Sequence, residues 1–398
     1  MRRWILVVVT LAMALVAGFV LAARAQEEGP AAAQGAAVDT TGKGYTAAYL
    51  IEPTTRRVLL AENADRMLPT ASMAKMMTCL IAMEQVRGGR LNLDMPVTIS
   101  ARASTMGGSQ IYAKQGQVFT LRALLAAAMV QSANDAAAAI AETVAGSNEA
   151  FAALMNERAK ELRLTHSVFH DPHGLPNFQD PQQVDQMSAH DLAILGMELM
   201  KYPLMRAYAK MPTMPFVNGT FTVGLTNPNH LIQPGKRDYY PPADGIKTGF
   251  SEPAGYCITA AARQGDMQLV CVVMGARRSF GPQSSFGIAA RLMGEAFAKW
   301  VMATPLRKGE PAGTVAVSGG RATTVPAIAG ADVRAVVRRG GEGRLQVAVS
   351  GGAKAPVRAG DTVGRIQVRE EGQVIATLPA VAGASVPVAS WWQKLWPF

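Results

Sequence analysis

Hydrophobic residues change their spacing along this chain, and the order of the changes leaves few folds open. Tyr45 to Ile51 and Arg57 to Leu60 are short apolar runs joined by Glu52-Pro53-Thr54-Thr55-Arg56, a pattern typical of a β-hairpin. Helical spacing follows in Ser72 to Val86, which ends at the stop signal Gly88-Gly89. The sequence therefore predicts a sheet whose first hairpin leads directly into a helical region.

Further changes of spacing complete this region. Leu121 to Val130 and Asp135 to Val144 are helical segments rich in Ala and Leu. Strand-like runs return at Tyr256 to Ala261 and Leu269 to Gly275 on either side of a polar turn, and Phe286 to Trp300 returns to helical spacing. We predict an α/β domain over residues 45–304, in which helices cover an antiparallel sheet.

The last quarter of the chain has a different composition. From Gly313 onward Val, Gly, Thr and Arg predominate, and apolar residues alternate in short runs at Val333 to Val337, Leu345 to Val349, Ile366 to Val368 and Val374 to Leu378. A chain of 398 residues also exceeds the usual size of one hydrophobic core. We therefore predict a second, small all-β domain, a β-sandwich over residues 305–380.

The amino-terminal segment has the pattern of a leader for export. Met1-Arg2-Arg3 is followed by the apolar run Trp4 to Ala23, and Ala23-Arg24-Ala25 supplies a small-x-small cleavage pattern. We predict a signal peptide over residues 1–25, with cleavage before Gln26. The alternative is an uncleaved membrane anchor, since the apolar run is nearly long enough to span a bilayer. Residues 26–44, rich in Ala and Gly, are predicted to be a flexible linker.

The carboxyl-terminal end combines positive charge with aromatic residues. From Leu306 to Phe398 there are twelve Lys and Arg residues against six Asp and Glu residues, and three Trp residues lie within Ser390 to Phe398. In an exported protein such charge favours lipid head groups or wall polymers over nucleic acid. We predict an amphipathic membrane anchor over residues 381–398, located at the periplasmic face of the inner membrane. The alternative is that these rings pack on the β-domain.

Three cysteines, Cys79, Cys257 and Cys271, cannot all pair within one chain, and their spacing does not match a metal site. We expect buried free thiols. A bridge between Cys257 and Cys271 is the alternative, because both lie on apparent neighbouring strands, although hairpin register does not obviously place them opposite each other.

The strongest chemical signal is the pair formed by Ser72 and Lys75. In Ser72-Met73-Ala74-Lys75 a hydroxyl and an amine lie three residues apart at a helix start, so both project from one helix face. A serine hydroxyl needs a base to become a nucleophile, and a lysine can be that base when burial and nearby positive charge lower its pKa. By itself this short pattern is weak evidence.

Two other short patterns strengthen the interpretation. Ser132-Ala133-Asn134 lies at the interruption between two apolar helices, where a loop can point into a cleft, and Lys247-Thr248-Gly249 enters a strand. The order of these three patterns, each in a fitting structural context, is typical of penicillin-binding proteins and class A β-lactamases. Together they predict a serine acyl-transfer enzyme.

The chain also resembles the low-molecular-mass D-alanyl-D-alanine carboxypeptidases, serine-type penicillin-binding proteins, in further segments. These are Pro69 to Ser72, Lys75 to Thr78, Gly107 to Ser109, Ser132 to Ala136, Met155-Asn156, Gly174 to Pro176 and Asp244 to Gly249. The resemblance covers about Tyr45 to Trp300, and the β-rich end resembles that family's tail. It implies a β-lactamase/transpeptidase-like fold. It also implies removal of the terminal D-alanine from peptidoglycan stem pentapeptides, no cofactor or metal, and covalent inhibition by β-lactam antibiotics.

The resemblance assigns catalytic roles to three residues. Ser72 would attack the carbonyl between two D-alanines and form an acyl-enzyme, and Lys75 would take its proton. Ser132 would pass a proton toward the leaving amine.

The resemblance also assigns the binding roles. Asn134 would hold the substrate amide and help fix Lys75. Within the strand motif Lys247 would supply positive potential, Thr248 would bind the terminal carboxylate, and Gly249 would belong to the same binding strand. The backbone N–H groups of Ser72 and Phe250 would form the oxyanion hole.

Two positions depart from the family's pattern. Ser285 stands where relatives often have an Arg thought to assist carboxylate binding, so Arg277 or Arg278 would compensate, or the preference at the last substrate residue would differ. Ala133 stands where many relatives have Gly, a small change.

Three other interpretations compete. Glu161 faintly resembles the general base of a β-lactamase, although a solvated Glu at a helix end is the simpler interpretation. A non-catalytic wall-binding protein is the second alternative, which the intact motifs argue against. His166, His170 and His173 suggest a metal site, but Pro172 interrupts any shared helix, and a loop near the cleft is favoured.

Overall fold

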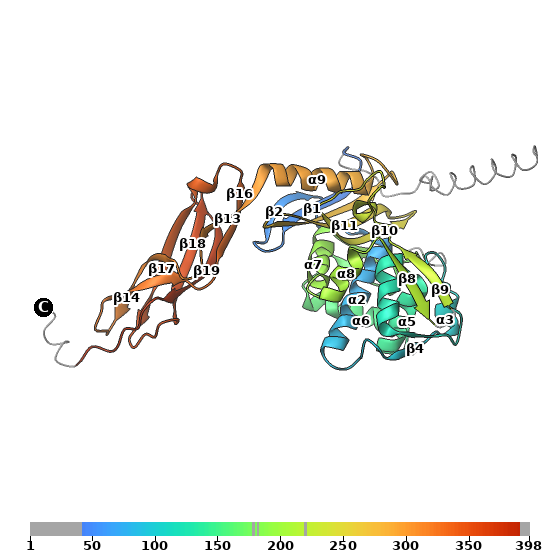
Figure 1. The fold of residues 1–398 in the computed structure, drawn as a ribbon, viewed down its shortest axis with the longest axis horizontal. Helices are drawn as coiled ribbons and strands as arrows, with labels where there is room; N and C mark the ends of the chain where they lie inside the picture. Colours follow the sequence, from blue (N-terminus) through green and yellow to red (C-terminus); the bar gives the residue numbers. More distant parts are fainter. Residues whose placement is uncertain (1–41, 177–179, 181–182, 219–220, 391–398) are drawn as a thin grey trace, which may run out of the picture.

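The computed structural model describes residues 42–176, 180, 183–218 and 221–390. They form a larger unit of helices around a sheet and a smaller, elongated unit of strands (Figure 1). The predicted signal peptide, most of the predicted linker and the aromatic end of the chain lie outside these residues. Within the described part of the chain, no helix is long and apolar enough to cross a membrane.

A five-stranded antiparallel sheet lies at the centre of the larger unit, with strand order β10-β11-β12-β1-β2. Its strands are β1 (Ala47–Glu52), β2 (Arg57–Glu62), β10 (Ala243–Ser251), β11 (Gly255–Gln264) and β12 (Met267–Ala276). The first hairpin and the late pair of strands therefore form one sheet, as the changes in spacing predict. This arrangement confirms the predicted α/β fold.

Helices cover both faces of this sheet, and the side chains of β1 show why. Ala47, Tyr49 and Ile51 pack in the core on the side of most helices, whereas Ala48 and Leu50 pack in the core beneath α9 (Ser285–Lys299). Successive residues of a strand point to opposite faces, and all six residues of β1 are buried, so the sheet needs cover on both faces. Figure 1 shows α9 on one side of the sheet and the remaining helices on the other.

The helical side is built from short helices with frequent caps. Ser100, Thr120, Ser147 and Ser188 each accept a hydrogen bond from a backbone N–H in the first turn of the helix that follows. The elements are η1 (Ala71–Ala74), α2 (Lys75–Arg87), α3 (Ala101–Ser104), α4 (Leu121–Ala126), η2 (Ala127–Gln131), α5 (Asn134–Ala145), α6 (Asn148–Glu161), α7 (Ala189–Leu199), α8 (Pro203–Ala209) and η3 (His230–Ile232).

Short strands complete the larger unit by pairing between the helices. They form three small sheets: β3 (Leu68–Pro69) with β7 (Gln186–Met187) and β6 (Ser167–Val168); β4 (Pro96–Thr98) with β5 (Val118–Thr120); and β8 (Thr213–Asn218) with β9 (Phe221–Thr226).

The smaller unit is a closed barrel extended by a two-stranded sheet. The barrel order is β14-β15-β19-β18-β17, and β13 pairs with β16. The elements are β13 (Trp300–Leu306), β14 (Pro311–Ser318), β15 (Thr324–Ala329), β16 (Val333–Arg338), η4 (Glu342–Arg344), β17 (Gln346–Lys354), β18 (Thr362–Glu370) and β19 (Gln373–Ala382). An all-β second domain is therefore confirmed.

Its details differ from the prediction in three ways. The parallel pairing of β14 with β17 closes a barrel, where a two-layer sandwich was expected. The predicted boundary after residue 304 falls inside β13, which belongs to the β-domain because it pairs with β16. The predicted anchor over residues 381–398 begins too early, because β19 runs to Ala382 and Val386 pairs with Val357.

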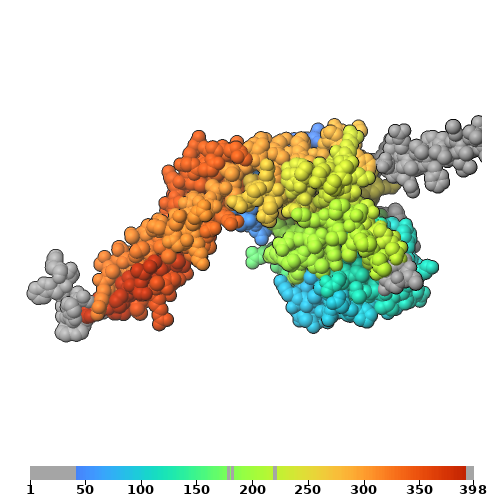
Figure 2. Space-filling view, in the orientation of Figure 1, coloured from blue at the N-terminus to red at the C-terminus, as the bar shows by residue number. Residues whose placement is uncertain are grey.

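An arginine of the central sheet contacts the β-domain. Arg57, at the start of edge strand β2, donates hydrogen bonds to the Val336 carbonyl at 2.6 Å and to the Glu370 carboxylate at 2.9 Å. Its guanidinium also lies over the ring of Trp300, at 4.6 Å from the ring centre. Figure 2 shows the units meeting near the top of the view, with an open recess between the barrel and the helices.

All three cysteines are buried in the larger unit and free, as expected. Cys271 lies opposite Ala260 and Cys257 lies opposite Gly249, so the alternative bridge does not form. Burial raises the pKa of each thiol to about 12.

Candidate active site

Ser72 and Lys75 lie together at the junction between η1 and α2. The Lys75 Nζ donates hydrogen bonds to the Ser72 Oγ at 2.8 Å and to the His173 carbonyl at 2.6 Å. Lys75 is completely buried, and this burial, together with the positive charge of Lys247, holds its pKa well below the usual value. A neutral amine in contact with the hydroxyl can accept the hydroxyl proton, which is what a serine nucleophile requires.

The turn before Ser72 is held by close packing against a second loop. Ala71 has a left-handed backbone with φ 46°, and Gly174 packs directly on it. A Cβ at position 174 would lie 1.9 Å from the Ala71 carbonyl oxygen, so only glycine fits. The Asp171 carboxylate in turn accepts hydrogen bonds from the backbone N–H groups of His173, at 2.7 Å, and Gly174, at 2.5 Å. The loop that carries the His173 carbonyl is therefore fixed next to the nucleophile.

Ser132 and Asn134 lie where the helical path is broken. The turn η2 ends at Ser132, whose left-handed backbone (φ 63°, ψ 29°) separates it from α5. The Ser132 Oγ accepts a hydrogen bond from the Lys247 Nζ at 2.8 Å. The Asn134 Nδ2 donates to the Gly107 carbonyl at 2.7 Å, while the buried Asn134 Oδ1 has no hydrogen-bond partner among the described residues. That oxygen is an acceptor available to a ligand.

Among the described residues no hydrogen bond joins Asn134 to Lys75, so the expected role of Asn134 in fixing Lys75 stays a prediction. The two hydrogen bonds of Lys75 go to Ser72 and to the carbonyl of His173, and the Asn134 amide nitrogen goes to Gly107. The main-chain carbonyl of His173 accepts the second hydrogen bond of Lys75.

Strand β10 brings Lys247, Thr248 and Gly249 to the same place. Lys247 is only 2% exposed, and burial lowers its pKa to about 8. Its Nζ also donates to the Thr248 carbonyl at 3.2 Å. Gly249 packs against the chain just before Ser72, because a Cβ there would lie 2.6 Å from the Thr70 carbonyl oxygen. Close approach of this strand to the nucleophile therefore depends on glycine.

These elements surround a groove of about 530 Å³. Six predicted residues line it: Ser72, Ser132, Asn134, Thr248, Gly249 and Phe250. Lys75 and Lys247 lie buried behind that lining. The groove thus presents two serine hydroxyls, an amide and a strand edge to a ligand, with two lysines beneath them.

The other wall of the groove is aromatic and was missed by the sequence analysis. Tyr256 stacks on Phe250 at 4.3 Å between ring centres, and the His230 ring stacks between Phe280 at 4.8 Å and Phe286 at 5.2 Å. These residues come from separate strands, helices and a loop, and they carry no shared motif. A local signal existed only for Phe250, which directly follows the Lys247 motif.

Other candidate residues lie away from the chemistry. Glu161 ends α6, where it pairs with Arg158 and its side chain is 65% exposed, and it does not line the groove. Ser285 does line the groove at the start of α9, whereas Arg277 and Arg278 are exposed and do not.

The three histidines considered for a metal site have other partners. His173 Nδ1 lies 2.7 Å from Asp171, the backbone N–H of His170 donates to Asp185, and His166 lies 3.9 Å from Asp65. The described residues contain no cluster of His, Cys, Asp or Glu side chains suited to a metal ion.

Comparison with known proteins decides the family. The family model described as D-alanyl-D-alanine carboxypeptidase matches residues 37–278, and the model of the penicillin-binding protein 5 C-terminal domain matches residues 300–388. The D-alanyl-D-alanine carboxypeptidase DacF of Bacillus subtilis is 30% identical over 339 residues, covering 84% of each chain. The chain belongs to the D-alanyl-D-alanine carboxypeptidase family.

Solved structures agree with the fold of this family. Penicillin binding protein 5 from Haemophilus influenzae matches with a TM-score of 0.74 at 24% identity, over 88% of this chain and all of that one. Penicillin-Binding Protein D2 from Listeria monocytogenes, solved in an ampicillin-bound form, matches with a TM-score of 0.55 at 26% identity, over 65% of this chain and 99% of that one. As a carboxypeptidase of this family, the chain is a serine-type peptidase, as the motifs predict.

Proposed function

We propose that this carboxypeptidase removes the terminal D-alanine from peptidoglycan stem pentapeptides through an acyl-enzyme on Ser72. The observation that carries the proposal is the 2.8 Å contact between the Ser72 Oγ and a fully buried Lys75 Nζ. Lys75 takes the hydroxyl proton as the oxygen attacks the carbonyl between the two D-alanines. The carbonyl oxygen becomes negative and is held by the backbone N–H groups of Ser72 and Phe250, where one donor is worth about 10²–10³ in rate.

Ser132 completes the first half of the reaction. Its hydroxyl lies between the groove and the Lys247 Nζ, so it can pass a proton to the leaving amine of the terminal D-alanine while Lys247 restores it. The products are free D-alanine and an ester on Ser72. Water then attacks the ester and its proton passes through the Ser132 hydroxyl to Lys247, while Lys75 returns the first proton to the Ser72 oxygen as the shortened peptide leaves.

The binding residues orient the substrate. Asn134 offers its unpartnered Oδ1 to a substrate amide N–H, since that oxygen is buried at the groove. Thr248 and the positive potential of Lys247 suit the terminal carboxylate, and Gly249 lets this strand approach Ser72. A β-lactam antibiotic carries a similar carbonyl and carboxylate, so we infer that it acylates Ser72 covalently.

The test compares Ser72→Ala with Ser279→Ala, a serine that lines the same groove outside the proposed chemistry. We expect Ser72→Ala to abolish covalent penicillin labelling and release of D-alanine from a synthetic pentapeptide. We expect Ser279→Ala to retain both. Stoichiometric labelling of Ser72→Ala would mean that another residue is the nucleophile. A cross-linked dimer assayed beside the pentapeptide measures any endopeptidase activity.

A β-lactamase remains the alternative activity because it shares the acylation step. The exposed position of Glu161 argues against it, since the candidate base does not reach the groove. Incubation with a chromogenic cephalosporin separates the two. The carboxypeptidase predicts a stoichiometric adduct that decays slowly, and rapid turnover would favour a β-lactamase. A non-catalytic wall-binding protein would neither label with penicillin nor release D-alanine.

We further propose that the mature chain is exported and held at the periplasmic face of the membrane by its carboxyl-terminal segment. The proposal rests on the leader pattern of residues 1–25, on the three Trp residues after Ser390 and on the basic excess of the last quarter of the chain. The same basic excess would attract anionic lipid head groups or wall polymers, and we propose no nucleic acid partner.

A further inference from the structure

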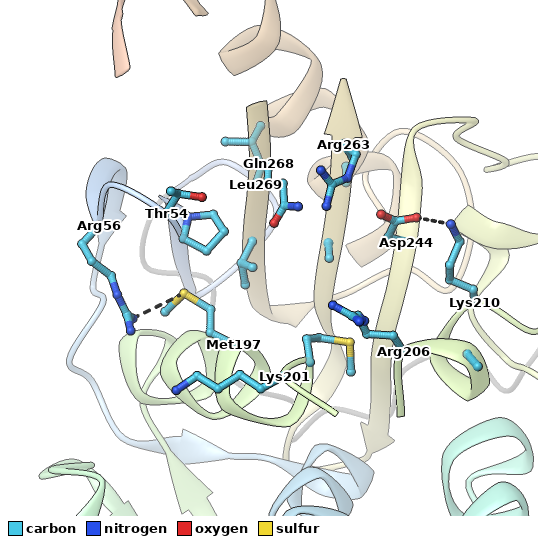
Figure 3. Close-up of a pocket in the computed structure, with 16 residues that line it drawn as sticks. Thr54, Arg56, Met197, Lys201, Arg206, Lys210, Asp244, Arg263, Gln268 and Leu269 are labelled. Atoms are coloured by element: carbon cyan, nitrogen blue, oxygen red, sulfur yellow. Dashed lines mark hydrogen bonds and ion pairs between the residues drawn. The ribbon is translucent and has the colours of Figure 1, made fainter. Parts of the chain in front are cut away.

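A second pocket, of about 570 Å³, lies at the end of the sheet away from the active-site groove (Figure 3). Strand β10 connects the two places: Asp244, at its start, lines the second pocket, and Phe250, near its end, lines the groove. The floor of the second pocket is apolar. It is formed by Met197 and Met200 at the end of α7 and by Leu269 and Val270 of β12. A pocket of this volume is large enough for a small organic ligand.

The rim of this pocket is strongly positive. Its five basic residues are all exposed: Arg56, Lys201, Arg206, Lys210 and Arg263. Asp244 is the single acidic residue of the lining, and it is paired with Lys210 at 2.5 Å. Lys201 is paired with Glu198 at 2.6 Å. The three arginines have no carboxylate partner within the described part of the chain, so the rim keeps an excess of positive charge.

The three unpaired arginines surround the apolar floor. Figure 3 shows the Arg206 and Arg263 side chains extending into the pocket from opposite sides, one from α8 and one from β11. The Arg263 guanidinium lies beside the neutral amide of Gln268, and the Arg56 Nη1 lies 3.6 Å from the Met197 sulfur. Arg56 also has a left-handed backbone, with φ 61°, in the turn between β1 and β2. Glycine or asparagine would adopt that conformation with less strain, so an arginine at this position carries a conformational cost.

We propose that this pocket binds the phosphate group of a phosphate ester. A phosphate monoester carries almost two negative charges and three acceptor oxygens, which matches several guanidinium groups better than a single carboxylate does. Guanidinium forks bind such oxygens in pairs, and the apolar floor accommodates the uncharged part of the ester. Bound phosphate would also remove the repulsion among the rim cations. None of the residues that line this pocket takes part in the proposed carboxypeptidase reaction, so phosphate binding here does not depend on the proposed function.

The test measures binding of inorganic diphosphate to the full chain by calorimetry. The pocket variants are Arg206→Gln, Arg263→Gln and the double variant. Arg334→Gln is the control, because it removes the same charge from an exposed position on β16. Each single variant should weaken binding about tenfold or more, since it removes charge-assisted hydrogen bonds. Diphosphate should also raise the melting temperature of the wild type and of Arg334→Gln, but not of the double variant. Unchanged penicillin labelling shows that the variants are folded.

A second arm identifies the source of the phosphate group. The same variants are sedimented with vesicles of phosphatidic acid, whose head group is a phosphate monoester, and phosphatidylcholine, and with vesicles of phosphatidylcholine alone. If the double variant loses affinity for the anionic vesicles relative to Arg334→Gln, the ligand is a lipid head group. If only diphosphate binding depends on the pocket arginines, the ligand is a soluble phosphate ester. The proposal is overturned if the double variant matches Arg334→Gln with both probes.

Discussion

Replacing Lys247 by Met tests the electrostatic basis of the active site, because it removes a buried charge and leaves a side chain of similar length. Lys247 is 2% exposed, and burial lowers its pKa from 10.5 to about 8. One pH unit corresponds to about 1.36 kcal/mol. The folded protein therefore holds this proton less tightly than the unfolded chain by about 3 kcal/mol, an order-of-magnitude figure for a fully buried group.

The sign of the pH dependence follows from which state holds the proton. Between pH 8 and 10.5 the unfolded chain binds a proton at Lys247 that the folded chain has lost, so the free energy of unfolding rises with pH. Across this interval we expect the free energy of unfolding to rise by about 3 kcal/mol more for the wild type than for Lys247→Met. Below pH 8 the folded and the unfolded chain both hold the proton. The difference in the free energy of unfolding between the wild type and Lys247→Met should therefore be constant there.

The three buried thiols provide the assay. Cys79, Cys257 and Cys271 all lie in the larger unit, so their labelling by a thiol reagent in urea reports opening of that unit and not of the barrel. Urea midpoints are compared at several pH values for the wild type, Lys247→Met and Lys114→Met, an exposed lysine of the same unit. The urea midpoints of Lys114→Met should change with pH as those of the wild type do. The reasoning would be refuted if the urea midpoints of Lys247→Met and of the wild type changed by the same amount from pH 8 to 10.5.

Three further predictions concern other features. Gly174→Ala should lower the rate of penicillin acylation on the order of 10²-fold by displacing the turn before Ser72, whereas Gly116→Ala, with φ +80° and nothing within 4 Å, should leave acylation unchanged. Arg57→Ala should weaken the contact between the units by about 1.5–3 kcal/mol, measured as faster proteolysis between them with acylation unaffected. Deleting residues 390–398 should move the protein from membrane to soluble fractions without changing peptide cleavage, and unchanged fractionation would exclude the anchor.

Much of the fold was predictable because its signals are local. The hairpin of β1 and β2, the late strands β11 and β12 and the final helix each follow from the spacing of neighbouring residues. The motif residues were also predictable as groups. Ser72 and Lys75 are separated by three residues at a helix start, so a helical turn alone brings them together.

Contacts between distant segments were not predictable in the same way. The His173 carbonyl that holds Lys75 is a main-chain atom, which every residue has, so no residue type marks it. The barrel closes through parallel pairing of β14 and β17, two strands separated by more than a complete hairpin, and alternating spacing cannot distinguish that closure from a sandwich. The aromatic wall of the groove similarly depends on segments distant in sequence that meet only in the folded chain.

The elongated arrangement of the two units has a consequence for reach. The described chain leaves the barrel where Gly320 pairs with Val388, beside the end of β14, at the tip that points away from the larger unit (Figure 1). A molecule tethered at that tip would carry its groove at a distance set by the length of the barrel. Shortening or lengthening the barrel would then change which layer of a surrounding polymer network the groove can sample, without altering a single residue around Ser72.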